Sequence, residues 1–103
     1  MRILILLAFG LWAAPVLAWE PMNVQDLNGA TVRYANAVQT FEASGKTVYT
    51  TARPSEGQWR EQGGKYCSIW PPGNVWACFA LEREGNKIRF LGEDGSVTDG
   101  VLE

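Results

Sequence analysis

The chain has 103 residues, of which nine are Lys or Arg and eleven are Asp or Glu, and it contains no His; its formal net charge is −2. The basic residues are scattered, which argues against nucleic-acid binding, because that requires Lys and Arg clustered to neutralise phosphates. The missing His removes the commonest general base, the usual partner of Ser and Cys nucleophiles and the commonest transition-metal ligand. We therefore expect a protein that is not an enzyme, with no catalytic residues, no metal site and no cofactor.

The chain begins with the pattern of a secretory signal peptide over residues 1–18. Arg2 supplies the positive charge, an apolar run follows it, and Val16 and Ala18 are small residues at the third-last and last positions before cleavage. The run is shorter than the roughly 20 apolar residues of a membrane-spanning helix. We expect cleavage after Ala18, a periplasmic or secreted protein without a membrane anchor, and one small β domain over residues 19–103.

The predicted elements after the signal are one helical turn and a series of short strands. Residues 19–23 are expected to be a mobile lead-in, with Asn23 capping a helical turn over 24–27. Strand-forming segments then alternate with turn signals every eight to twelve residues, a pattern typical of an all-β sandwich or small barrel. Short connections predict an antiparallel meander of seven or eight strands, and the sequence leaves barrel and sandwich open. The expected strands cover 31–34, 37–42, 47–52, 58–61, 65–70, 75–83, 87–91 and, as an edge strand, 96–102, with a break over 53–57.

Cys67 and Cys78 predict a disulfide-bonded hairpin, since an even pair of cysteines in an exported chain is typically bridged. A four-residue loop over 71–74 places the two cysteines directly opposite one another. Opposed Cα atoms in a non-hydrogen-bonded pair lie about 4.5 Å apart, within the range of a disulfide. The same register pairs Tyr66 with Phe79, Ser68 with Ala77, Ile69 with Trp76 and Trp70 with Val75, and alternation places Tyr66, Ser68, Trp70, Val75, Ala77, Phe79 and Leu81 on the core face.

The predicted binding patch comprises Trp70, Pro71, Pro72, Asn74 and Trp76. Exposed aromatic side chains beside a Pro-containing loop offer a large contact area to a partner, and core packing is the alternative for the tryptophans. We expect a binding or interaction module whose partner is an envelope or extracellular protein. An inhibitor of that protein is one version of this expectation. The alternatives are an accessory envelope protein held by the edge strand over 96–102, and a small-molecule carrier with an interior cavity lined by Tyr34, Tyr49, Trp59 or Phe90.

Two resemblances accompany these patterns. The tripeptide Gly57-Gln58-Trp59 is similar to the G-x-W motif of lipocalins, which implies a barrel. A longer series of motifs, covering roughly Trp59 to Phe90, resembles small exported bacterial β-proteins of unknown function with a single disulfide hairpin, some of which carry the automatic label dihydrodipicolinate reductase. That activity needs a strand–G-x-G-x-x-G–helix unit, which the chain lacks, so only the β architecture is carried over. The motifs are Gly57-x-Trp59, Gly63-Gly64, Lys65-Tyr66-Cys67, Trp76-Ala77-Cys78-Phe79 and Ile88-Arg89-Phe90.

Overall fold

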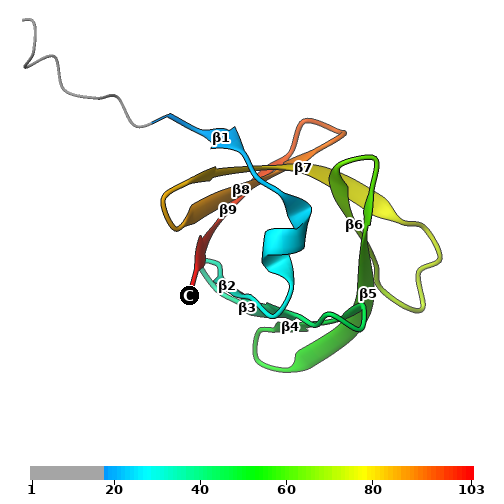
Figure 1. Ribbon diagram of the computed structural model, residues 1–103. Helices are drawn as coiled ribbons and strands as arrows, with labels where there is room; N and C mark the ends of the chain where they lie inside the picture. The colour runs from blue at the N-terminus through cyan, green and yellow to red at the C-terminus, as the bar shows by residue number, and fades with distance from the viewer. Residues whose placement is uncertain (1–17) are drawn as a thin grey trace, which may run out of the picture.

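A closed antiparallel barrel forms the body of the protein in the computed structural model, which describes residues 18–103 (Figure 1). The expected signal peptide, apart from Ala18, lies outside the described residues. Eight strands follow one another as a meander, and β9 pairs with β2 as well as with β8, which closes the sheet. The strands are β2 (Thr31–Arg33), β3 (Val38–Phe41), β4 (Lys46–Thr50), β5 (Pro54–Gln62), β6 (Lys65–Ile69), β7 (Ala77–Glu84), β8 (Lys87–Gly92) and β9 (Val97–Leu102).

Closure answers the question that the sequence left open, in favour of a barrel over a sandwich. It also shows that the expected edge strand over 96–102 is wrong. Val32 pairs with Leu102 on one side of β9, while Ile88 pairs with Gly100 on the other. Because its last two residues pair with β2, β9 closes the sheet and is not an open edge strand.

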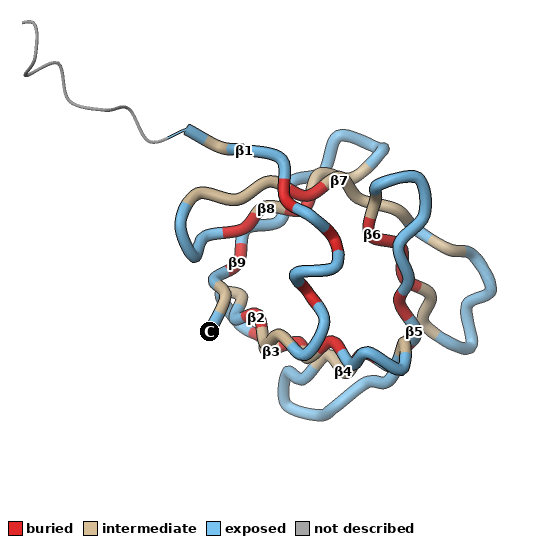
Figure 2. Tube along the Cα trace, viewed as in Figure 1, coloured by how far each residue is buried: buried red, intermediate tan, exposed pale blue. Residues whose placement is uncertain are grey.

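Buried and exposed residues alternate along the strands, as Figure 2 shows, because the pleat of a strand turns successive side chains to the barrel interior and to its outer surface. On β3, Gln39 and Phe41 are buried, and on β5, Gly57 and Trp59 are buried between exposed neighbours. The core cluster consists of Met22, Val24, Leu27, Val32, Phe41, Trp59, Tyr66, Leu81, Ile88 and Phe90.

One end of the barrel is closed by the short 3-10 helix η1 (Val24–Leu27), which lies within the ring of strands in Figure 1. The Asn23 side chain accepts a hydrogen bond from the Gln25 N–H at 2.9 Å, so the expected cap and helical turn are confirmed. Val24 and Leu27 are 2% and 0% exposed. Burying a side chain of this kind contributes about 1.5–3 kcal/mol, so η1 acts as an apolar plug.

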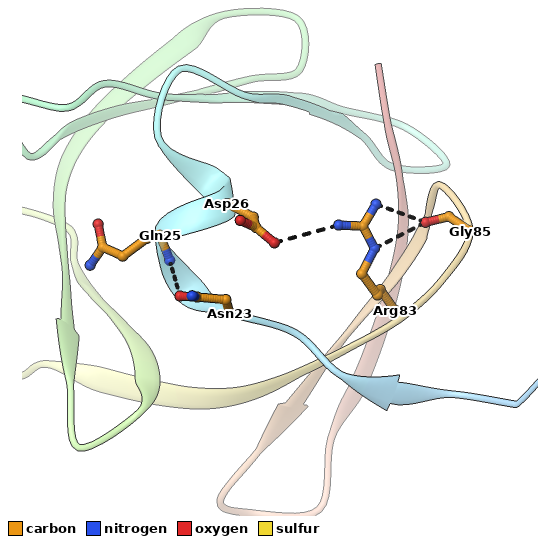
Figure 3. Close-up of polar contacts among 5 residues, drawn as sticks. All are labelled: Asn23, Gln25, Asp26, Arg83 and Gly85. Atoms are coloured by element: carbon orange, nitrogen blue, oxygen red, sulfur yellow. Dashed lines mark hydrogen bonds and ion pairs between the residues drawn. The ribbon is translucent and has the colours of Figure 1, made fainter.

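Polar contacts hold η1 against the turn between β7 and β8 (Figure 3). Arg83 donates two hydrogen bonds to the Gly85 carbonyl oxygen, at 3.1 Å from Nε and 2.9 Å from Nη2. Its Nη1 lies 3.5 Å from Oδ2 of Asp26 on η1. Both charged side chains are well exposed, so this ion pair orients the plug and adds little stability.

The lead-in expected over 19–23 is wrong in part, because Glu20–Pro21 forms a short strand, β1, on the barrel wall. Pro21 pairs with Glu82, and the Met22 N–H donates to the Leu81 carbonyl oxygen at 3.0 Å. β6 pairs with β7 only as far along as Phe79. The second half of β7 therefore has free backbone groups on that side, and β1 satisfies them.

The break expected over 53–57 is also wrong, since β5 runs without interruption from Pro54 to Gln62. Pro54 is the first residue of the strand, a position where the missing N–H does no harm. Gly57 is required by close packing, because a Cβ at this position would lie 2.6 Å from the Trp70 ring and 2.7 Å from the Ile69 carbonyl oxygen. The glycine makes room for a neighbouring side chain and does not form a turn.

The disulfide between Cys67 and Cys78 is confirmed, with their Cα atoms 4.0 Å apart. The register is as expected at the bridge and at the pairs on either side of it. The loop is longer than the expected four residues, because β6 ends at Ile69 and β7 begins at Ala77. The expected pairs of Ile69 with Trp76 and Trp70 with Val75 therefore do not form, and Val75 and Ala77 are exposed instead of facing the core.

Candidate functional site

A cavity of about 430 Å³ opens at the end of the barrel opposite η1. Strands β3 to β8, together with residues next to or within β2 and β9, contribute to its wall, so the closed sheet holds the site in shape. In the part of the chain that the structure describes, no Asp, Glu, Lys or Arg lines it. The lining residues are Tyr34, Gln39, Tyr49, Ser55, Tyr66, Ser68, Trp70, Phe79, Phe90 and Thr98.

Aromatic rings make up most of the cavity wall. Tyr34 lies between Tyr49 and Phe90, with ring centroids 5.7 and 5.9 Å apart. Tyr49 meets Trp70 edge to face at 6.2 Å. Phe79 and Phe90 also meet edge to face, at 6.3 Å. Rings in mutual contact hold their rotamers, so the wall presents a largely preformed apolar surface.

A buried amide forms the polar floor of the cavity. The Gln39 Oε1 atom accepts a hydrogen bond from the Tyr34 hydroxyl at 2.7 Å. Its Nε2 atom donates to Thr47 Oγ1 at 2.9 Å and to the Tyr66 hydroxyl at 3.1 Å. The Trp70 Nε1 donates to Ser68 Oγ at 3.2 Å at the side of the same cavity. All these groups are uncharged, and their bonds fix how polar atoms face the cavity.

Burial changes the acidity of two of the lining tyrosines. It raises the pKa of Tyr34, with the nearby Tyr66 and Tyr49 adding to the effect. It also raises the pKa of Tyr66, against hydrogen bonds from Ser68 and Gln39 that lower it. Both phenols are therefore neutral hydrogen-bonding groups near neutral pH.

Three of the four aromatic residues expected to line an interior cavity do so: Tyr34, Tyr49 and Phe90. Trp59 lies deeper in the barrel, edge to face with Phe41 at 5.7 Å, and its Nε1 donates to the Glu42 carbonyl oxygen at 2.9 Å. It belongs to the packed core between cavity and plug. The G-x-W tripeptide thus contributes Gly57 to the space for Trp70 and Trp59 to the core.

The binding patch expected from the sequence is divided between two surfaces. Trp70 turns into the cavity, whereas Trp76 lies on the outer wall, where the Arg60 guanidinium carbon is 3.9 Å from the centroid of its ring. Pro71, Pro72 and Asn74 are exposed in the loop that joins the two sides. The patch residues are neighbours in sequence and do not form one continuous face.

Sequence reasoning missed three of the four polar lining residues of the cavity and placed the fourth, Ser68, on the core face. Gln39 and Thr98 read as ordinary positions on short strands, and Ser55 as part of the break over 53–57. The period-two alternation of a strand could have identified them. Each lies an even number of residues from an inward-facing residue on the same strand, as Gln39 does from Phe41.

Comparisons of the chain with protein-family models, with curated proteins and with solved structures find no match. Within residues 18–103, no group of three or more Cys, Asp or Glu side chains is arranged to hold a metal ion. Over the same residues, no helix is long and apolar enough to cross a membrane.

Proposed function

We propose that the protein is a non-enzymatic binding module of the periplasm or the extracellular space, and that the barrel mouth takes one small, uncharged, partly aromatic molecule. The observation that carries the proposal is the cavity of about 430 Å³ with aromatic walls and a polar floor. Pockets for small ligands have volumes of about 300–1,000 Å³ and combine apolar walls with a few placed polar groups. Barrels of eight strands have interiors wide enough for one such ligand.

The lining chemistry favours a neutral ligand. A charged group that leaves water for this cavity would lose its hydration and find no opposite charge among the lining residues. Burying an unpaired charge is far more costly than burying a hydrogen-bonded neutral group. A flat apolar molecule with one or two neutral polar atoms would instead contact the rings of Phe79 and Phe90 and reach Gln39 and its hydroxyl partners.

The compartment is inferred from two observations. The disulfide between Cys67 and Cys78 is consistent with an oxidising location outside the cytoplasm. Residues 1–18 carry the signal-peptide pattern. Together they support export of the protein to the periplasm or the medium.

A second candidate is an inhibitor-like interaction with an envelope or extracellular protein through the loop 70–76. Val75, near the end of this loop, is 77% exposed, which is unusual for a large apolar side chain. The accessory-protein alternative has less support, because β9, the strand that was to supply an open edge, pairs with β8 and, at Val101 and Leu102, with β2, and so belongs to the closed wall.

The test is a fluorescence titration of the purified, oxidised protein with N-phenyl-1-naphthylamine, a neutral probe that brightens in apolar surroundings. Thr98→Trp fills the mouth from an exposed lining position, and Val75→Ser is the matched control outside it. We expect saturable binding that Thr98→Trp weakens at least tenfold and Val75→Ser leaves unchanged. Absence of saturable binding, or equal binding by Thr98→Trp and the wild type, would contradict the proposal.

A further inference from the structure

At the cavity floor, the donor and the acceptor of each hydrogen bond can be assigned, and the assignment begins with the hydroxyl of Thr47. Its hydroxyl donates to the Thr40 backbone carbonyl at 2.7 Å, which uses its single hydrogen. Its contact with Gln39 at 2.9 Å must therefore be one in which Thr47 accepts. This orients the Gln39 amide with Nε2 toward Thr47 and Tyr66, and Oε1 toward Tyr34.

The orientation of Gln39 decides what the two tyrosine hydroxyls do. Tyr34 must donate to Oε1, so its hydrogen is used within the protein. Tyr66 must accept from Nε2, so its own hydrogen remains to be donated elsewhere. Both amide hydrogens of Gln39 are then engaged, and the floor itself offers no further N–H to a ligand.

Tyr66 and Ser68 form a pair with at least one hydroxyl hydrogen to spare. Tyr66 accepts from Gln39 Nε2 and Ser68 Oγ accepts from Trp70 Nε1, and neither bond uses a hydroxyl hydrogen. The two hydroxyls therefore keep two hydrogens, and at most one of these can lie between their oxygens. Within residues 18–103, neither hydroxyl donates to any other acceptor. Both residues line the cavity and are 4% exposed, so the spare hydrogen is available to a ligand bound in the cavity.

We propose that the ligand presents a neutral hydrogen-bond acceptor, such as a carbonyl oxygen or an aromatic ring nitrogen, to the Tyr66–Ser68 hydroxyl pair. The apolar remainder of the ligand lies against Phe79 and Phe90, which contact the Tyr66 ring at 6.0 and 5.5 Å between centroids. This inference rests on the proposed function, since it specifies the ligand chemistry of the same cavity. A ligand with only an N–H donor would leave the spare hydroxyl hydrogen buried without a partner, which is unfavourable.

Quinoline and indole form a suitable pair of probes, because they are flat bicyclic molecules of similar size and hydrophobicity. Quinoline offers a ring-nitrogen acceptor and indole an N–H donor. Dissociation constants for both follow from chemical-shift titrations of the purified, oxidised protein at neutral pH. We expect quinoline to bind about fivefold more tightly than indole, the ratio that one net hydrogen bond gives.

The double variant Tyr66→Phe/Ser68→Ala removes both hydroxyls and should abolish the preference for quinoline. The matched control is Tyr49→Phe, which removes a hydroxyl from another ring of the same cavity and should keep the preference. A second measurement does not depend on the stability of a variant: the nitrogen resonance of ¹⁵N-labelled quinoline should shift on binding to the wild type in the direction of a hydrogen-bonded ring nitrogen.

The outcomes separate the two proposals. Equal affinity for the two probes, tighter binding of indole, or a preference that survives in the double variant would overturn the acceptor inference and leave the cavity a binding site. If neither quinoline, indole nor N-phenyl-1-naphthylamine binds, the proposed function itself is overturned. Quinoline preferred by the wild type and by Tyr49→Phe, and not by the double variant, would support both.

Discussion

Removing the disulfide should destabilise the barrel by an amount that follows from the length of the loop that the bridge closes. Cys67 and Cys78 lie 11 positions apart in the sequence, and the entropy of closing a loop of this size corresponds to about 3 kcal/mol. The suitable substitution is alanine at both positions. Cys67 is fully buried, and a serine there would add the cost of a buried hydroxyl. For a chain of this size, 3 kcal/mol lowers the melting temperature by roughly 12–24 °C.

The assay is urea unfolding followed by circular dichroism, for the oxidised wild type, the reduced wild type and Cys67→Ala/Cys78→Ala. Reduced wild type is the matched control, since it keeps both side chains and loses only the bond. We expect both altered forms to unfold at lower urea, with free energies of unfolding about 3 kcal/mol below that of the oxidised protein. A difference below about 1 kcal/mol for both forms would refute the argument that the bridge holds this small barrel together.

Three further perturbations test the packing and the buried tyrosines. Gly57→Ala should cost about 1–3 kcal/mol and alter N-phenyl-1-naphthylamine binding, because the new Cβ would lie 2.6 Å from the Trp70 ring and push it into the cavity; unchanged urea unfolding and unchanged probe affinity would contradict this. Leu27→Ala should cost about 2–5 kcal/mol, since this fully buried side chain belongs to the plug; melting like the wild type would show that η1 adds nothing to the core. Burial raises the pKa values of Tyr34 and Tyr66, so the unfolded chain releases these protons first and the free energy of unfolding should fall as pH rises above about 10; a constant free energy from about pH 8 to about pH 11, in urea unfolding, would be inconsistent with that burial.

The strands and the hairpin could be predicted from the sequence, because each depends on local signals. Turn residues separate the strand-forming segments, and the register around Cys67 and Cys78 follows from a loop and a disulfide that point to the same pairing. Asn23 predicted its helical turn in the same way, since a cap depends on neighbouring residues alone.

The features that the sequence did not predict depend on contacts between distant segments. Closure rests on pairing between β2 and β9, which no local pattern reports. Gly57 reads as a turn residue unless the position of Trp70 against it is known. The same limit applies to the binding patch, since the loop 70–76 directs Trp70 inward and Trp76 outward.

The cavity itself was expected as one alternative, through its aromatic residues, and not as the leading one. Alternation assigns side chains to two faces of a sheet, but it does not say whether that sheet closes around one of them. The closed barrel turns the face that carries Tyr34, Gln39 and Phe90 into the wall of an interior space.

The most direct test of a ligand site in the barrel mouth uses the tryptophans as reporters at three depths. Trp70 lines the cavity, Trp59 lies in the core below it, and Trp76 lies on the outer wall against Arg60. The measurement is a titration of the ¹⁵N-labelled, oxidised protein with quinoline, in which the indole N–H resonances are followed. We expect a saturable shift of the Trp70 resonance, with that of Trp76 unchanged. A shift of Trp76 without Trp70, or no shift of either at saturating quinoline, would contradict a binding site in the mouth of the barrel.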